Sequence, residues 1–198
     1  GLESIVNIAQ SLGFYQMTGI DLPSERKGFV PSRSWKKQRL HEAWYAGETA
    51  NLSIGQGYLQ VTPAQALVMI AAAATGGKYF TPHLVDKIGG VKVFEARVKN
   101  CSVSQEHWKL IRSGLDASVN SEGGTGRLAR AQGLRVAGKT GTAQSGQEKN
   151  HAWFVGYAPA DNPKVAMVVF LEHGGRGGVA AAKMASAIFE KLIEFHYV

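Results

Sequence analysis

The sequence predicts an α+β fold, α/β in the broad sense, in which an antiparallel sheet is flanked by helices. Residues 135–143, 152–158 and 165–171 are apolar segments of strand length, and a short turn between the last two favours an antiparallel pair. Other segments repeat apolar residues at helical spacing. The 198 residues are 44% hydrophobic and 19% charged, a composition that excludes disordered and low-complexity classes.

The first part of the chain predicts one helix and a long irregular segment. Apolar residues recur on one helical face over residues 2–12, with no capping residue before them. Residues 18–58 are rich in Gly, Pro and Ser and show little periodicity. We therefore expect an irregular segment there, of the length that often carries function.

A capping signal predicts where the second helix begins. Thr62 is a good capping residue, Pro63 suits the first turn, and Gln65 completes a capping box with Thr62. The glycine pair 76–77 is expected to end this helix.

The rest of the chain alternates strands and helices. Segments 79–85 and 91–94 predict a β-hairpin that turns near residues 89–90. Ser104 is expected to cap a helix with this apolar stripe: Trp108, Ile111, Leu115 and Val119. A glycine pair at 177–178 opens the last helix, whose inward face is expected to be Ala181, Met184, Ala185, Ile188, Leu192 and Phe195.

The charge of the chain and its few potential metal ligands limit which nucleic acids, metals or cofactors it could bind. The chain has 22 basic and 15 acidic residues, a net charge of +7, densest at residues 33–39. No RNA-binding motif accompanies this cluster, so a solvated basic surface is the simpler interpretation and no nucleic-acid partner is predicted. The lone Cys101 excludes an internal disulfide and a cysteine-based zinc site. The histidines are not spaced as metal ligands either, and no metal or cofactor is predicted.

Residues 133–140 read G-L-R-V-A-G-K-T and match the P-loop pattern letter for letter. Residues 134–137 are strand-like, however, where a phosphate-binding loop needs glycine-rich backbone. Residues 141–146 are a poor helix start. A P-loop nucleotide-binding protein therefore remains only an alternative.

The same letters contain a second motif, Lys139-Thr140-Gly141, whose chemistry suits a strand. Lys139 offers a cation for a substrate carboxylate, and Thr140 and Thr142 offer hydroxyls beside it. Gly141 lets a ligand backbone approach closely. An exposed strand edge here could also pair with an extended peptide.

Several segments, in order, resemble the penicillin-binding protein transpeptidases. Residues 137–144, A-G-K-T-G-T-A-Q, resemble the third active-site motif of this family. Three more segments resemble its other elements: S-I-G-Q-G-Y…V-T-P-A-Q at 53–65, G-G-T-G at 123–126, and A-W-F-V-G-Y-A-P at 152–159. The segments W-K-K at 35–37 and W-Y-A-G-E-T at 44–49 resemble class B members of the elongation type.

This resemblance implies the serine β-lactamase and transpeptidase fold and a D,D-transpeptidase that cross-links peptidoglycan. Such enzymes use a serine to attack a D-Ala-D-Ala stem peptide, and β-lactams acylate the same serine. By the resemblance, Lys139 binds the donor carboxylate and tunes proton transfer, and Thr140, Gly141 and Thr142 contact the substrate. The Thr142 N–H is expected to serve as an oxyanion-hole donor.

The resemblance also implies partners and a location. The expected partners are stem peptides, β-lactams and the cell-elongation machinery, which determines cell shape. The expected location is the periplasmic face of the bacterial inner membrane, with any membrane anchor outside this chain.

The nucleophile motif S-x-x-K is where the chain departs from the family. Residues 24–27 and 34–37 fit its letters, but no apolar helix follows either, and both are interpreted as solvated loops. Residues 118–120 fit S-x-N but lie at a helix end, after the segment where the family carries that motif. We therefore expect no nucleophile in residues 1–198, which would be the C-terminal part of a transpeptidase domain, incomplete and inactive alone. A non-catalytic peptidoglycan-binding module is the other alternative.

Overall fold

The computed structural model describes residues 1–95, 97–146 and 149–198. The chain forms two compact units. One comprises residues 1–68 and 80–98, and the other comprises residues 69–79 and 99–198. Helix α4 (Pro63–Thr75) begins in the first unit and continues into the second. Among the described residues, no helix has both the length and the apolar character that crossing a membrane requires.

The first unit contains two helices where the sequence predicted an irregular segment. After α1 (Leu2–Ser11), the helices α2 (Arg33–Leu40) and α3 (Ala46–Ser53) both lie within residues 18–58. The prediction was wrong because neither eight-residue helix carries an apolar stripe. Tertiary contacts hold them instead, as they often do for short helices.

A buried ion pair joins α2 to α3. Lys36 is only 2% exposed, and its ammonium lies 2.6 Å from a Glu48 oxygen and 3.2 Å from a Glu42 oxygen. Burial alone would lower the pKa of Lys36, but the hydrogen bonds that its ammonium donates to Glu48 and Glu42 outweigh burial and raise the pKa above 10.5. Lys36 therefore stays charged and holds the two helices together, although the sequence had suggested a solvated surface here.

The predicted capping box of α4 is confirmed. The Thr62 N–H donates to the Gln65 side-chain oxygen at 3.0 Å, and the Gln65 N–H donates to the Thr62 hydroxyl at 3.2 Å. The Gln65 amide nitrogen also donates to the carbonyls of Gln16 at 2.8 Å and Lys27 at 2.9 Å. The fully buried Gln65 side chain therefore hydrogen-bonds to three segments of the first unit and connects them.

Replacing Gln65 with Glu is expected to destabilise the protein by about 2–4 kcal/mol, although the two side chains have nearly the same shape. The substitution removes two donors and turns an oxygen toward two carbonyl oxygens. Thermal melting of the full-length protein measures the effect, with the exposed Gln132→Glu as the matched control. Equal melting temperatures for the two variants would contradict this role for Gln65.

The predicted hairpin is correct at its turn and at the start of its second arm, and wrong in its first arm. Strands β2 (Lys87–Ile88) and β3 (Val91–Lys92) pair antiparallel across glycines 89–90. Residues 79–85, however, do not form one arm. Strand β1 (Lys78–Phe80) pairs instead with β4 (Val98–Asn100).

The reason is a side chain that uses the backbone donors of the expected arm. The Asp21 carboxylate accepts the N–H groups of Leu84 and Val85, at 2.7 and 2.9 Å. These two hydrogen bonds hold the pKa of Asp21 below its usual 3.8. Residues 84 and 85 therefore bond to a distant aspartate rather than to a neighbouring strand.

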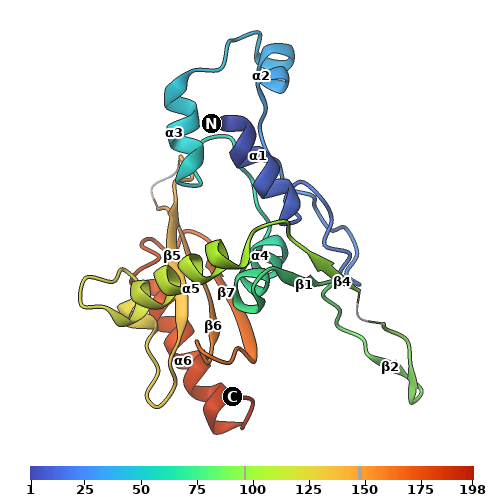
Figure 1. The fold of residues 1–198 in the computed structure, drawn as a ribbon, viewed down its shortest axis with the longest axis vertical. Helices are drawn as coiled ribbons and strands as arrows, with labels where there is room; N and C mark the ends of the chain where they lie inside the picture. The colour runs from blue at the N-terminus through green and yellow to red at the C-terminus, as the bar shows by residue number, and fades with distance from the viewer. Residues whose placement is uncertain (96, 147–148) are drawn as a thin grey trace. The chain divides into compact units, whose positions relative to one another are not determined.

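The second unit carries the predicted antiparallel sheet, and the fold class is confirmed. Its strands are β5 (Ala137–Ala143), β6 (His151–Ala158) and β7 (Val165–Leu171), in the spatial order β5-β6-β7 (Figure 1). Both neighbouring pairs are antiparallel. The bounds of β6 and β7 match the prediction to within one residue, and β5 begins two residues later than expected.

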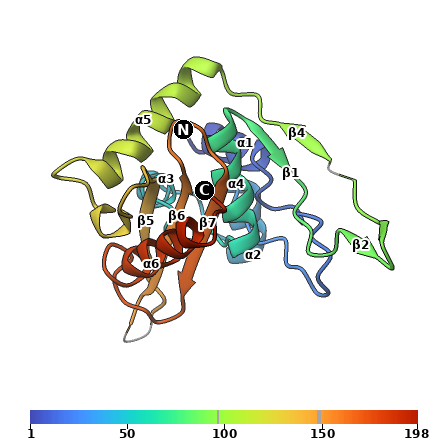
Figure 2. The same cartoon turned by 90° about the horizontal axis from the view of Figure 1, so that it is seen from below.

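Helix α6 (Ala180–Glu194) covers one face of this sheet, as Figure 2 shows from below. Phe154 and Val169 on the sheet and Ala185 and Phe189 on the helix belong to one buried cluster. Helix α5 (Gln105–Asn120) packs against β5. Ser104 caps α5 as predicted, because its hydroxyl accepts the His107 N–H at 3.3 Å.

The predicted inward face of α6 was only half right. Ala181, Ala185 and Leu192 do pack in the core. In contrast, Met184 is 45% exposed, Ile188 39% and Phe195 62%. The buried stripe is centred about 100° around the helix from these three residues. Small alanines allow a close approach to the sheet, and that approach determines which apolar residues are covered.

Candidate functional site

The predicted motif lies on β5, which is an edge strand of the described sheet. Strand β6 pairs with β5 on one side, and no described strand pairs with it on the other. The register places Thr140 opposite Phe154, and Gly141 opposite Trp153. An edge strand leaves a row of backbone groups for another chain, so β5 can accept an extended peptide as a further strand.

The side chains of the motif divide between the two faces of β5. Residues directly opposite each other in a sheet share a face. Thr140 lies opposite Phe154 and Thr142 lies opposite Ala152, so both threonines are on the face of β5 that meets the core. Lys139 and Gly141 lie on the other face of the strand. The exposed Lys139 ammonium donates to the Thr140 carbonyl at 2.9 Å, so it reaches back to the strand itself.

Two segments outside the sheet hold the threonine hydroxyls in place. The Thr140 hydroxyl donates to the Thr125 hydroxyl at 3.2 Å. The Gly177 N–H donates to the Thr142 hydroxyl at 3.1 Å. The segments 123–126 and 174–178 thus both contact β5. Sequence reasoning had recognised the first segment only by resemblance, gave Thr125 no role, and expected Gly177 only to open the last helix.

Glycine makes the contact between β5 and the 174–178 segment possible. A Cβ on the buried Gly177 would lie 2.0 Å from the Gly141 carbonyl oxygen and 2.6 Å from the Trp153 carbonyl oxygen. Such distances are far inside van der Waals contact. Only a residue without a side chain allows this segment to rest on the motif strand.

The 123–126 segment is fixed by the end of α5. The Gly126 N–H donates to the Ser118 carbonyl at 2.9 Å, and a Cβ on Gly124 would lie 2.3 Å from the same oxygen. Asn120 donates to the Val136 carbonyl at 2.9 Å, just before β5. The S-x-N letters at 118–120 therefore build the support of β5, in agreement with the interpretation of this match as structural.

An ion pair also joins α5 to the chain entering β5. Arg135 donates two hydrogen bonds to the Asp116 carboxylate, at 2.8 and 2.7 Å. These hydrogen bonds are the main reason that the pKa of Asp116 lies below its usual 3.8, and a bond from Asn120 at 2.9 Å adds to the effect. The pair orients the strand that carries the motif.

The stabilisation by this pair is expected to depend on pH. Because the folded pKa of Asp116 is depressed, its contribution is full above about pH 4 and is lost as the pH falls through the folded value. Asp116→Asn should therefore lower the melting temperature at about pH 7 by a few degrees, since Arg135 is 61% exposed and solvent screens the pair. At about pH 2.5 the difference from wild type should shrink. A difference that does not depend on pH would contradict the ion pair, and the exposed Asp86→Asn serves as the control.

The two S-x-x-K matches lie on the surface of the first unit. Ser24 is exposed and outside any helix, as expected. Ser34 lies in α2, not in a loop, and its hydroxyl is 3.0 Å from that of Ser32. Both serines and the lysines three residues after them are exposed. Neither match lies at the start of a buried helix.

The P-loop alternative does not fit the structure. Residues 137–143 are one continuous strand that runs through Lys139 and Thr140, and the next element among the described residues is strand β6, not a helix. A phosphate-binding loop needs the glycine-rich turn and the helix N-terminus that are absent here. Within the described ranges, no three His, Cys, Asp or Glu residues come together as metal ligands.

A comparison with known protein families identifies the class of protein that carries this edge strand and the segments packed on it. The family described as the penicillin binding protein transpeptidase domain matches residues 1–194, and the chain belongs to this family. Among its relatives is the peptidoglycan D,D-transpeptidase MrdA of Acinetobacter baumannii. That protein is 35% identical over 210 residues, which cover 96% of this chain and 31% of MrdA.

Solved structures agree with the family assignment. The penicillin-binding protein PBP2 of Helicobacter pylori superposes with a TM-score of 0.90 and 31% identity, covering 100% of this chain and 36% of that one. PBP2 of Pseudomonas aeruginosa superposes with a TM-score of 0.85 and 34% identity, covering 99% of this chain and 43% of that one. The chain spans about a third of the length of the curated relatives it matches.

Proposed function

We propose that the protein carrying this chain is a serine-type peptidoglycan D,D-transpeptidase of the elongation type. The observation that supports this most is the Lys139-Thr140-Gly141 motif on an edge strand, with two threonine hydroxyls held by neighbouring segments. Family membership and the similarity to MrdA support the same reaction class.

In this proposal β5 acts as the docking edge for the donor stem peptide. The peptide backbone pairs with β5, and Gly141 allows the close approach because it has no side chain. Lys139 and the hydroxyls of Thr140 and Thr142 bind the terminal carboxylate, for which an ammonium and hydroxyl donors are suited. The Thr142 N–H donates to the oxyanion that forms when a serine attacks the peptide carbonyl.

We propose further that the nucleophilic serine lies outside residues 1–198, and that these residues are the C-terminal part of the transpeptidase domain. Two features support this. The S-x-x-K matches at Ser24 and Ser34 lie on exposed surface. The chain corresponds to about a third of its relatives, which leaves room for a nucleophile elsewhere in the protein.

Labelled penicillin tests both statements. The full-length protein should form one covalent penicilloyl adduct, and peptide mapping by mass spectrometry should place it on a serine outside these 198 residues. An adduct on Ser24 or Ser34 would overturn the second statement. Absence of any adduct would overturn the first and favour the non-catalytic peptidoglycan-binding module.

Partners and location follow from the same proposal. One similar solved structure is the complex between PBP2 and MreC of Helicobacter pylori, with a TM-score of 0.88 to this chain. We propose that this protein likewise works with elongation-machinery proteins, on the periplasmic face of the inner membrane. Its small-molecule ligands would be stem peptides and β-lactams.

A further inference from the structure

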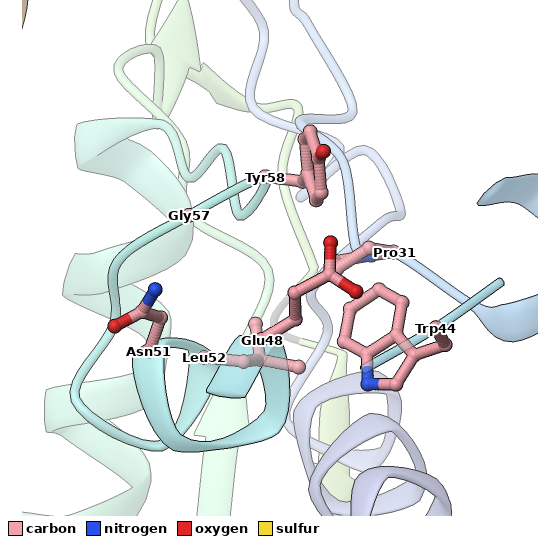
Figure 3. Close-up of a pocket in the computed structure, with 7 residues that line it drawn as sticks. All are labelled: Pro31, Trp44, Glu48, Asn51, Leu52, Gly57 and Tyr58. Carbon is pink, nitrogen blue, oxygen red and sulfur yellow. The ribbon is translucent and has the colours of Figure 1, made fainter. Parts of the chain in front are cut away.

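The first unit contains a pocket of about 200 Å³ that the proposed reaction does not use. Its lining comes from the α2–α3 region and the segment after it: Pro31, Trp44, Glu48, Asn51, Leu52, Gly57 and Tyr58. In Figure 3 the Glu48 carboxylate lies between the Trp44 indole and the Tyr58 ring, and the Asn51 amide lies across the pocket from Trp44. The pocket therefore combines aromatic walls with a few converging polar groups, as small-ligand sites do.

The aromatic walls are fixed in place. The Trp44 and Tyr58 ring centres are 6.5 Å apart, and the rings are inclined at 54°. The Trp44 indole N–H donates to the Thr49 hydroxyl at 2.9 Å. Trp35 packs on Tyr58 from outside the pocket, with ring centres 5.0 Å apart. Two rigid aromatic surfaces thus face a space that no described side chain fills.

Glu48, the charged side chain of the pocket lining, is held in an ion pair. One Glu48 oxygen accepts from the Lys36 ammonium at 2.6 Å, and the other accepts the Tyr45 N–H at 2.7 Å. The bond from Lys36 is the main cause that lowers the pKa of Glu48 below 4.5, and the Tyr45 N–H adds to it. The carboxylate remains ionised, and Lys36, which also contacts Glu42 at 3.2 Å, offsets part of its charge. The pocket therefore does not favour an anion, and the Glu48 oxygens keep lone pairs for hydroxyl groups.

Asn51 supplies the remaining polar groups. Its side chain is exposed and makes no hydrogen bond to another of the described residues. Its amide can both donate and accept, which is the pattern that complements another amide. No described residue of the first unit uses this capacity.

From these contacts we propose that the pocket binds one sugar ring, an N-acetylhexosamine of a glycan strand. A pyranose ring is uncharged, with an apolar C–H face for Trp44 or Tyr58 and a hydroxyl edge for Glu48. The acetamido group pairs with Asn51. The proposal rests on the proposed function, because peptidoglycan is the polymer that would present such sugars; the pocket would hold the glycan whose stem peptides react.

Titration with the N-acetylglucosamine trimer, observed by saturation-transfer NMR on the full-length protein, tests the assignment. Saturation transfer to the acetyl methyl group is expected. Asn51→Ala should weaken binding about fivefold to tenfold, and Tyr58→Leu should weaken it comparably. The exposed Asn100→Ala is the matched control and should bind as wild type does. Cellotriose, which lacks the acetamido group, should bind the wild-type protein more weakly than the N-acetylglucosamine trimer does. It should bind Asn51→Ala as strongly as it binds the wild-type protein.

Three results would overturn the assignment: no saturation transfer to the trimer, the same affinity in Asn51→Ala as in Asn100→Ala, or binding of a stem pentapeptide that depends on Asn51 while the trimer does not bind. Penicillin acylation of the wild-type protein, measured on the same preparation, separates this inference from the proposed function. Acylation without sugar binding refutes only the sugar site. Sugar binding without acylation refutes the transpeptidase and leaves the pocket assignment standing.

Discussion

Replacing Lys139 with alanine in the full-length protein is expected to slow penicillin acylation by about 100-fold, equivalent to about 2.7 kcal/mol in the activation free energy. Lys139 is the motif cation, and its loss leaves the ligand carboxylate without a charged donor on β5. Because the side chain is exposed, the melting temperature should remain close to that of wild type. The measurement is the second-order rate constant of acylation, followed with a fluorescent penicillin.

The exposed Lys164→Ala, on the same unit, is the matched control and should acylate at the wild-type rate. Lys139→Arg keeps the charge and should recover part of the lost rate, although the guanidinium has a different shape. Unchanged kinetics in Lys139→Ala would refute the role of Lys139. A large loss in Lys164→Ala would show that net charge matters more than the position of the cation.

Replacing Gly177 with alanine is expected to destabilise the β5 region by about 3 kcal/mol, at the upper end of what overpacking costs. The new methyl group would stand 2.0 Å from the Gly141 carbonyl oxygen and 2.6 Å from that of Trp153. Both atoms are backbone, so no side chain can rotate away. Gly177 does not have a positive φ, and the cost is therefore steric rather than conformational. Hydrogen exchange of peptides covering residues 137–158 should accelerate.

Gly114→Ala is the matched control because it makes the same chemical change with the opposite expected sign. Gly114 lies within α5, and a Cβ there meets nothing within 4 Å. Alanine should stabilise that helix by about 0.5–1 kcal/mol. If Gly177→Ala behaved like Gly114→Ala, the close contact between the 174–178 segment and β5 would be refuted. Because the contact holds the Thr142 hydroxyl, Gly177→Ala should also slow acylation.

Local signals in the sequence were sufficient for strands β5, β6 and β7, the caps and the motif. Thr62 and Gln65 form the capping box that their spacing predicts, and Ser104 caps α5. Strand β7 has the predicted bounds, because an apolar run between turn residues is a short-range signal. The motif at Lys139 could be placed on a strand for the same reason. That this strand lies at the edge of the sheet was only one of the options that the sequence left open.

The features that depend on distant residues could not be predicted in this way. Helix α2 has no apolar stripe, and it forms around Lys36, which is buried only because Glu42 and Glu48 arrive from farther along the chain. Residues 84 and 85 have strand-like sequence but bond to Asp21, more than 60 residues away in sequence.

The sequence by itself determined the class of protein, the order of α5, β5, β6, β7 and α6 along the second unit, and the strand that carries Lys139. These depend on hydrophobic period, capping residues and motif letters, which are properties of neighbouring residues. The tertiary structure alone decided which face of α6 is buried, which segments hold Thr140 and Thr142, and where Trp44, Glu48 and Asn51 enclose a pocket. Each of these depends on contacts between residues that are not neighbours in the chain, and such contacts are fixed by packing and hydrogen-bond geometry rather than by spacing along the chain.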